Sequence, residues 1–435
     1  MTNNKNNTTF AEYQRPKKLK KPEVFNDAIY GYIYIDYDFL EQLINTFPMQ
    51  RLRRIKQLSF VNIVFSCGEN SRFIHSLGVY ELARRFLDKN NSILKGIFTH
   101  RDQMLLLTTA LLHDVGHGSY SHVFEEIFET NHEKKSAEII EKHSQIVYIL
   151  DKLDLDFKYD VASIIKKENK FKLIEQLLTS QLDFDRLDYL KRDAFFVGVS
   201  YGYIDSERLI RSMEIDKKNN NIVFKKSNIS VIENYLISRY HMHSIVYNHS
   251  KVLGFSVIFR NIFKRLLCLL KGNYKFQIDK ENNSNSILSI LRKFQKNPDD
   301  IQAYLDIDDF YINTLIFYLK DEKDQILSDL CFDFLNRKIW SCLENNSKKN
   351  KEQIEKINNY YGDNKEYYTY DKDISFIIYN NKDENIGESI LIYKKNKSQF
   401  KVFSKESPII NNVVLNKKSG KKQNKSKFFY REYQE

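Results

Sequence analysis

The sequence predicts a mainly α-helical protein, and three observations support this expectation. Glycine and proline are scarce, with 13 and 5 residues in a chain of 435, so residues that end helices are rare. Apolar residues recur at helical spacing in several segments. Residues 229–270 contain one glycine and no proline, as expected of one or two long helices. With 42% hydrophobic residues, the chain can bury a sizeable core and fold as one large domain or two.

The expected helices follow a short β-hairpin. Residues 25–36 alternate aromatic and β-branched residues around Gly31, which predicts a hairpin before a first helix at residues 37–46. Residues 76–89 carry apolar side chains at i, i+3, i+4 and i+7, the pattern of an amphipathic helix. Residues 103–115 are apolar on nearly every side, which predicts a buried central helix that Gly116 ends.

The chain divides into three parts by composition. Residues 1–22 are polar and basic, and we expect a disordered or loosely docked arm. We expect a core at residues 23–345, with its motifs at residues 24–251 and a helical extension at residues 252–345. Residues 346–435 are rich in asparagine and lysine and predict a small α+β appendage, with strands at residues 374–379 and 389–393 and a lysine-rich tail.

Cysteine spacing and hydropathy indicate in which cellular compartment the protein works and whether it contacts a membrane. The four cysteines are widely spaced and form no CxxC pair, which argues against a disulfide framework and a thiolate zinc site. The N-terminus has no apolar targeting segment, and no apolar run approaches the ~18 residues that span a bilayer. We therefore expect a cytoplasmic protein without a membrane partner.

The net charge of +11 would suit a polyanionic partner, but lysine is abundant along the whole chain. The densest lysine cluster consists of Lys417, Lys418, Lys421, Lys422, Lys425 and Lys427. A solvated tail is the simpler explanation, and from it we expect only weak, non-specific contact with nucleic acid.

Two imidazoles and two carboxylates form the strongest chemical signal in the sequence. They are His75, His113, Asp114 and Asp185. This donor set suits a divalent ion such as Mn²⁺, Fe²⁺, Mg²⁺ or Zn²⁺ and leaves positions for water and substrate. A histidine and an aspartate beside each other in an apolar helix are costly to bury unless a metal compensates for their desolvation. We therefore predict a catalytic metal site.

Further titratable residues follow the His113–Asp114 pair. They are His117, His122, Glu125 and His132. His122 and Glu125 lie at i, i+3 on the next predicted helix, where the carboxylate can orient the imidazole as an acid or base. Such a pair is usually surface decoration, but beside a metal site we interpret it as functional. Residues 183–193 are most simply explained as a solvated acidic helix. We nevertheless predict Asp185 as a ligand, because the metal needs a further carboxylate from a distant part of the sequence.

Several ordered motifs resemble one known family. The segments are FNDAIYGYIYI, MQRLRRIKQL, SRFIHSLGV, LLHDVGHGSYSH, NHE, LDFDRLDYLKRDAFFVG and RYHMHSIVYNHSK. Together they resemble the HD-domain deoxynucleoside triphosphate (dNTP) triphosphohydrolases, which include dGTPases and the SAM-and-HD-domain proteins. The resemblance runs from about Val24 to Lys251.

The resemblance implies a role for each matching position. The family's metal ligands fall on the four residues chosen above, and His117, His122, Glu125 and His132 match groups that serve the phosphates and proton transfers. His122 matches the acid for the departing sugar oxygen. Residues that match triphosphate- or sugar-holding positions are Arg72, Arg186, Tyr189, Asp193, Arg239 and Tyr247, and Gln57 with Leu58 match the wall beside the sugar. The resemblance also implies a homo-oligomer.

Two positions depart from the family pattern. Glu125 stands where some relatives carry aspartate, and its equal charge should preserve the pair with His122. Asn45 stands where guanine-sensing relatives carry an aspartate, so we expect weak or no activation by guanine nucleotides.

Two alternative functions remain open from the sequence. One is another HD-type phosphohydrolase, such as a nucleotide phosphatase, an alarmone hydrolase or a phosphodiesterase, because metal ligands alone fix only phosphoester cleavage. The other, from a different class, is a nucleic-acid-binding protein with a vestigial site. The complete set of ligands argues against the second.

Overall fold

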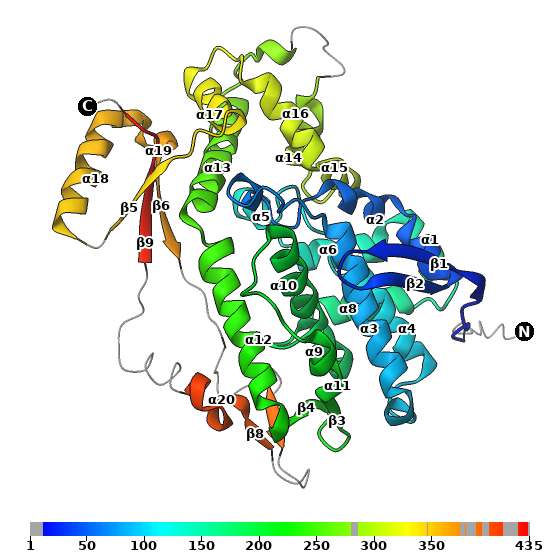
Figure 1. Ribbon diagram of the computed structural model, residues 1–435. Helices are drawn as coiled ribbons and strands as arrows, with labels where there is room; N and C mark the ends of the chain where they lie inside the picture. The colour runs from blue at the N-terminus through cyan, green and yellow to red at the C-terminus, as the bar shows by residue number, and fades with distance from the viewer. Residues whose placement is uncertain are drawn as a thin grey trace, which may run out of the picture.

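A computed structural model describes residues 12–279, 286–345, 347–374, 379, 389–393, 400–411 and 425–433. It confirms the expected mainly helical fold with small sheets (Figure 1). The α-helices of the first half are α1 (Asp38–Ile44), α2 (Phe47–Arg51), α3 (Arg72–Leu94), α4 (His100–Leu112), α5 (His122–Phe128), α6 (His132–Lys142), α7 (Ser144–Leu150), α8 (Phe157–Ile165), α9 (Lys172–Thr179), α10 (Phe184–Val197) and α11 (Ser206–Ser212).

The second half continues the helical series. Its α-helices are α12 (Ile229–His241), α13 (Ser250–Lys271), α14 (Leu288–Lys296), α15 (Ile301–Leu305), α16 (Asp309–Leu319), α17 (Gln325–Leu335), α18 (Lys348–Tyr361), α19 (Lys365–Tyr368) and α20 (Phe403–Glu406). A π-helix, η4 (Met242–Tyr247), follows α12. The 3₁₀ helices are η1 (Leu52–Arg54), η2 (Val61–Ile63), η3 (Lys226–Asn228), η5 (Gln277–Asp279) and η6 (Gly362–Asn364).

The strands form three small sheets. The strands are β1 (Lys18–Asp27), β2 (Gly31–Tyr37), β3 (Met213–Asp216), β4 (Asn221–Lys225), β5 (Ser341–Glu344), β6 (Thr369–Ile374), β7 (Leu391–Tyr393), β8 (Phe400–Val402) and β9 (Lys425–Tyr430). The sheet orders are β1-β2, β3-β4-β7-β8 and β5-β9-β6.

The predicted N-terminal hairpin is present as antiparallel β1 and β2. Gly31 begins β2 with φ of 75°, a left-handed conformation that glycine adopts without strain. The boundary of the expected disordered arm is wrong at its end, because residues 18–22 already belong to β1. Lys18 pairs with Tyr37 of β2, a register shift separates this pair from Glu23 and Ile35, and Gln14 N donates to Leu153 O at 2.7 Å. Residues 1–11 lie outside the described part of the chain.

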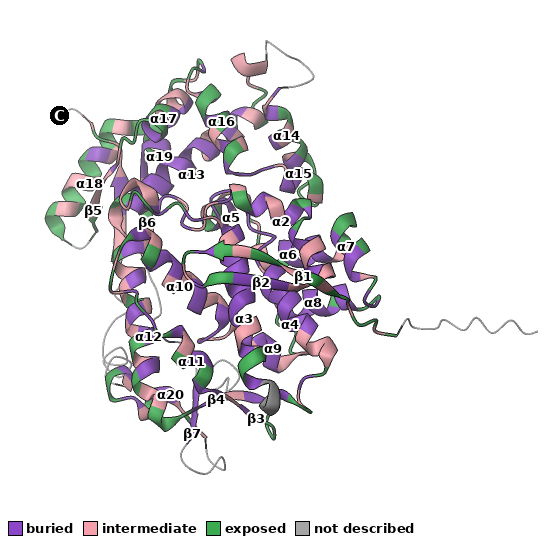
Figure 2. Cartoon of the chain, turned by 45° about the vertical axis from the view of Figure 1, so that its right-hand side comes forward, coloured by how far each residue is buried: buried purple, intermediate pink, exposed green. Residues whose placement is uncertain are grey.

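Helix α3 occupies the centre of the bundle and packs against α4 and α10. Figure 2 shows α3 as mostly buried, whereas α18 is largely exposed. A glycine on α3 permits the close approach of α10, because a Cβ added at Gly78 would lie 1.9 Å from Asp188 Oδ1. The bundle therefore brings the first predicted histidine helix against the acidic helix.

The long helices predicted for residues 229–270 are α12 and α13, joined through the π-helix η4. In Figure 1 they run as one column beside the bundle, with the β5-β9-β6 sheet next to α13. Part of the predicted C-terminal appendage pairs with the predicted core of residues 23–345, because β7 lies parallel to β4 in one sheet. The strand expected at residues 389–393 is present as β7, while most of residues 374–379 lie outside the described part. The division at residue 345 stays a prediction.

The lysine cluster falls mostly outside the described residues, which exclude Lys417, Lys418, Lys421 and Lys422. Lys425 and Lys427 belong to β9 between β5 and β6, so the backbone at these two positions is part of a sheet. The Lys427 ammonium donates to Ser250 Oγ at 2.5 Å. Among the described residues, no helix combines the length and the apolar character needed to cross a membrane.

Candidate active site

The four predicted metal ligands lie together at the centre of the bundle. His75 Nε2 lies 3.3 Å from His113 Nε2 and 3.1 Å from Asp185 Oδ1. Asp114 completes the group, with Oδ1 3.4 Å from His113 Nε2 and Oδ2 3.6 Å from His75 Nε2. The four side chains come from α3, the end of α4 and α10. The donor atoms of His75, His113 and Asp185 lie within 4.8 Å of one another, close enough to share one ion, and Asp114 adjoins the two histidines and also pairs with Arg72.

Helix α4 ends one turn earlier than predicted. Its last residue is Leu112, so His113 is the C-cap and Asp114 follows the helix. The His113 ring is oriented by Nδ1, which lies 2.9 Å from the Ala110 carbonyl oxygen. This contact leaves Nε2 directed at the ligand cluster, the arrangement that metal-ligating histidines usually show.

The electrostatics of the cluster fit a cation. Burial lowers the pKa of His75, but hydrogen bonds to Asp185 and Asp188 outweigh it and raise the pKa to about 10. The carboxylates around His75 therefore attract positive charge to this point, which a divalent ion supplies on binding.

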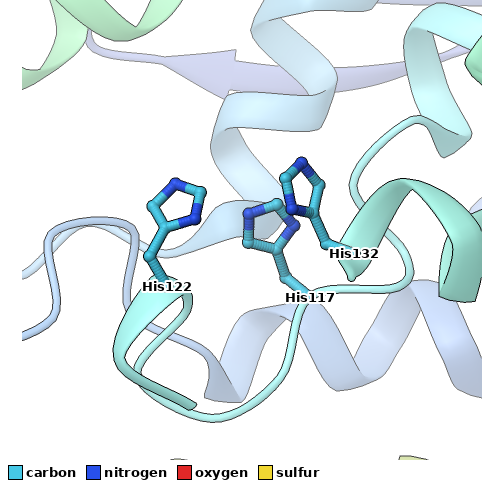
Figure 3. A group of neighbouring side chains, drawn as sticks. All are labelled: His117, His122 and His132. Atoms are coloured by element: carbon cyan, nitrogen blue, oxygen red, sulfur yellow. The ribbon is translucent and has the colours of Figure 1, made fainter. Parts of the chain in front are cut away.

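A second cluster consists of three histidines, His117, His122 and His132 (Figure 3). The rings of His117 and His132 have centroids 4.0 Å apart, and each lies 5.5 Å from the ring of His122. Glu125 joins two of them, with Oε2 3.0 Å from His122 Nδ1 and Oε1 2.6 Å from His132 Nδ1. The predicted His122–Glu125 pair on one helix is therefore present, and His132 is a second partner of the same carboxylate.

The histidines of this cluster differ in their preferred charge. Burial, and then the nearby Arg72 guanidinium, hold the pKa of His117 well below its usual range. Burial also lowers the pKa of His132, but its hydrogen bond to Glu125 outweighs this effect and the net shift is upward. The surroundings therefore favour the neutral form of His117 and the protonated form of His132, so the adjacent rings are suited to accept a proton from a ligand and to donate one to it.

The loop that carries these histidines is held in a strained conformation. Tyr120 and Ser121, directly before His122, both have φ of 55°, which is unfavourable for residues with a Cβ. Asp309 Oδ1 accepts hydrogen bonds from Ser119 Oγ and Tyr120 N at 2.8 and 2.9 Å. Arg72 Nε donates to Ser121 Oγ at 2.8 Å. These contacts fix the start of α5 and so the position of His122.

The helical extension stabilises the same loop through Arg51 and Tyr304. Arg51 is fully buried and donates to three carbonyl oxygens, those of His117, Leu305 and Ile307, at 2.7 to 2.8 Å. Tyr304 Oη donates to Gly116 O at 2.6 Å. A Cβ at Gly116 would lie 2.1 Å from Ser136 N, so only glycine fits where the loop passes α6.

One cavity of about 540 Å³ connects both clusters, a volume within the roughly 300–1,000 Å³ of small-molecule sites. The predicted residues that line it are Gln57, Leu58, Arg72, His113, Asp114, His117, His122, His132, Asp185, Arg186, Tyr189, Asp193 and Tyr247. His75, Glu125 and Arg239 do not line it. His75 and Glu125 instead contact residues that do.

Two arginines predicted to hold phosphates differ in their pairing: Arg186 of α10 lines the cavity, whereas Arg239 of α12 does not. Arg186 is paired with the Asp183 carboxylate and the Ser180 carbonyl oxygen. Arg239 is different, because its buried Nε and Nη1 atoms have no hydrogen-bond partner among the described residues. A buried guanidinium without acceptors is costly, which fits a site that receives an anion.

The predicted sugar-facing residues form a polar pair. Tyr247, at the end of the π-helix, donates from Oη to Asp193 Oδ2 at 2.9 Å, and Asn70 Nδ2 donates to Asp193 Oδ1 at 3.1 Å. Burial raises the pKa of Asp193 to about 6. The Tyr189 and Tyr247 rings lie edge to face, with centroids 6.3 Å apart.

Comparisons with known proteins identify the family. The HD domain model matches residues 72–193, which contain every proposed metal ligand, and the HD associated region model matches residues 204–328. The uncharacterized protein YwfO of Bacillus subtilis is 34% identical over 421 residues, covering 95% of this chain and 93% of that protein. The chain belongs to the HD-domain family. It is a metal-dependent phosphohydrolase, as the sequence predicted.

Two further relatives of this HD-domain protein have informative names. The deoxynucleoside triphosphate triphosphohydrolase SAMHD1 homolog of Dictyostelium discoideum is 29% identical, covering 68% of this chain and 62% of that protein. The crystal structure of a phosphohydrolase from Bacteroides thetaiotaomicron has a TM-score of 0.78 and 26% identity, and the match covers 94% of this chain and all of that one.

Sequence reasoning missed several residues of the HD-domain site. Lys167 and Lys372 line the cavity, and no local motif marks either. Asp188 is not among the predicted site residues either, although its i, i+3 spacing from Asp185 on α10 was a usable signal. Asn45, predicted to weaken guanine sensing, lies outside the main cavity in a separate hollow with Gln42 and Gln145.

Proposed function

We propose that this phosphohydrolase converts deoxynucleoside triphosphates into the deoxynucleoside and inorganic triphosphate. The observation that carries this proposal is the single cavity that joins the ligand cluster, the three-histidine cluster and Arg72 with Arg186. The name of the Dictyostelium relative supports the same substrate class.

The charges around the cavity suit a triphosphate. Arg72 and Arg186 line the cavity and Arg239 lies outside its lining, and all three offer planar, forked donors that match phosphate oxygens. Arg239 has buried nitrogens without partners, so an anion placed beside it would satisfy them. Leu58 is 7% exposed and supplies an apolar wall. Against the sugar, such a wall would exclude a 2′-hydroxyl and so favour deoxyribose.

The chain's own residues then divide the work of hydrolysis. The divalent ion, when held by His75, His113, Asp114 and Asp185, supplies Lewis-acid activation of the phosphoryl group and the attacking water. The arginines orient the phosphate chain for in-line attack at the α-phosphorus. The Glu125 contact occupies His122 Nδ1, which leaves Nε2 to protonate the departing 5′-oxygen.

Product analysis tests this function directly. Purified protein is incubated with each of the four dNTPs and Mn²⁺ or Mg²⁺ in ¹⁸O-labelled water, and ion exchange separates the products. We expect a deoxynucleoside and labelled triphosphate. Orthophosphate as the first product would instead identify a nucleotide phosphatase, and cleavage of polymer with intact dNTPs would identify a nuclease.

A further inference from the structure

The C-terminal sheet reaches the active-site cavity through one lysine. Lys372 of β6 lines the same cavity as His113 and His122. Residue 372 lies beyond both family matches, which end at residues 193 and 328. It follows Asp185, the last proposed metal ligand, by 187 residues, yet the fold places it beside Glu126 of α5.

A network on the α13 side of the cavity fixes this lysine. Lys372 Nζ lies 3.0 Å from Glu126 Oε2, and Tyr370 Oη donates to Glu126 Oε1 at 3.2 Å. Tyr370 and Lys372 are two residues apart on one strand, so their side chains leave the same face of β6. From α13, Arg260 Nε lies 3.6 Å from Glu126 Oε1 and its guanidinium lies over the Tyr370 ring at 4.2 Å.

The charges in this network do not cancel. Glu126 supplies one negative charge, whereas Lys372 and Arg260 supply two positive charges. The three side chains together therefore carry a net charge of +1, although Arg260 itself does not line the cavity. Lys372 is the member of the cationic pair that lines the cavity, and its side chain is only 24% exposed.

The position of Glu126 links this network to the chemistry. Glu126 follows His122 by four residues on α5, so the two side chains share a helix face. Both residues line the cavity together with Lys372. A ligand that contacts His122 therefore lies within reach of the wall that Lys372 forms.

We propose that Lys372 is a substrate-binding residue that donates a hydrogen bond to an oxygen or ring-nitrogen acceptor of the bound nucleotide, and that Glu126 and Tyr370 position it. This inference rests on the proposed function and deepens it. Arg72 and Arg186 line the cavity elsewhere, so Lys372 adds a donor on the α13 side that the family motifs do not include. The acceptor belongs either to the phosphate chain or to the base.

Steady-state kinetics of three variants test the proposal. Lys372→Gln removes the charge, and Lys372→Arg keeps it. Lys401→Gln is a matched control, because Lys401 of β8 pairs with Glu406 of α20 at 3.0 Å. We expect Lys372→Gln to raise KM about tenfold or more, the loss expected for one charge-assisted hydrogen bond, with kcat within about twofold. Lys372→Arg should restore most of the loss, and the control should match wild type.

A binding measurement identifies the source of the acceptor. Inorganic triphosphate is titrated into the metal-loaded wild type and Lys372→Gln. A weaker Kd in the variant assigns the contact to the phosphate chain. An unchanged Kd, combined with a KM increase that differs among the four dNTPs, assigns it to the base.

The two proposals fail in different ways. Wild-type protein that turns over no dNTP overturns the proposed function, whatever the variants do. Normal wild-type turnover with the same KM and the same triphosphate Kd in Lys372→Gln overturns the role of Lys372 alone.

Discussion

His75 Nδ1 lies 2.7 Å from Asp188 Oδ2, and this contact fixes which nitrogen of the His75 ring faces the metal-ligand cluster. Arg192 holds the same carboxylate through Nε and Nη2, both at 2.9 Å, and donates from Nη1 to Asp27 Oδ2 at 2.7 Å. Asp188 and Arg192 are fully buried. A chain of ion pairs thus runs from the N-terminal hairpin to the proposed metal ligand.

Asp188→Asn should weaken metal binding without removing a ligand. The amide keeps one acceptor but loses the negative charge that favours Nδ1–H on His75, and changes of this kind cost roughly 10- to 100-fold in metal affinity. Metal titration of the stripped protein measures the effect. Asp88→Asn, on an exposed side chain of the same bundle, is the control. Equal affinities of the two variants would contradict the role of Asp188.

His113→Ala should remove a proposed ligand itself. Because the remaining donors are only His75, Asp114 and Asp185, we expect loss of bound metal and of activity in a protein that still folds. Elemental analysis and circular dichroism of the purified variant measure both. Full metal content with normal turnover would show that the ion is held elsewhere.

Glu125→Gln should change the pH dependence of the reaction. The hydrogen bond to Glu125 raises the pKa of His132 against the effect of burial, so a function that needs protonated His132 is present below that pKa and is lost as pH rises through it. Removing the carboxylate charge lowers the pKa and moves this loss to lower pH. The profile of kcat/KM against pH measures the shift.

Two results bear on this pH prediction. Glu129→Gln, at the exposed C-cap of the same helix, should leave the profile unchanged. An alkaline limb that stays in place in Glu125→Gln would show that His132 does not control it.

Arg51→Met should destabilise the whole domain. The substitution leaves the carbonyl oxygens of His117, Leu305 and Ile307 without their buried donor. Each unsatisfied acceptor costs about 1–3 kcal/mol, so the free energy of unfolding should fall by about 3 kcal/mol or more. Urea unfolding measures the change, with Arg211→Met as a control on an exposed arginine. A similar small loss in both variants would contradict the bracing role.

The sequence predicted the parts of this site that local patterns encode. His113 and Asp114 stand out because two polar residues end an apolar helix, and His122 with Glu125 stand out by their helical spacing. The contacts of Arg51 with Leu305 and of Lys372 with Glu126 join residues 254 and 246 positions apart. A local sequence pattern cannot predict such distant pairs, because they form only when the helical extension and the C-terminal sheet pack against the rest of the protein.

The end of α4 shows the same limit on a smaller scale. The apolar run predicted that the helix continues to Gly116, but His113 is the C-cap and Asp114 lies beyond it. Ser136 of α6 donates from Oγ to the His113 carbonyl oxygen at 2.7 Å and accepts from Gly116 N at 2.9 Å. A tertiary partner therefore replaces the helical hydrogen bonds one turn early, which the local sequence did not indicate.

His122→Ala should slow the chemical step while the metal stays bound. His122 does not belong to the ligand cluster of His75, His113 and Asp185, and its side chain is 72% exposed to the cavity and solvent. Its removal should therefore leave the fold and the metal content unchanged. Loss of a general acid lowers kcat by roughly 10²–10⁴-fold.

Pre-steady-state turnover and metal analysis of the same sample separate these effects. His100→Ala, which removes a histidine paired with Tyr13 outside the cavity, should keep kcat within about twofold of wild type. A 5′-thio analogue, in which sulfur replaces the leaving 5′-oxygen, should restore much of the rate in His122→Ala, because a thiolate departs without protonation. If kcat of His122→Ala equals that of wild type, the proton comes from another group, and His117 is the first to test, since its ring centroid lies 5.5 Å from that of His122.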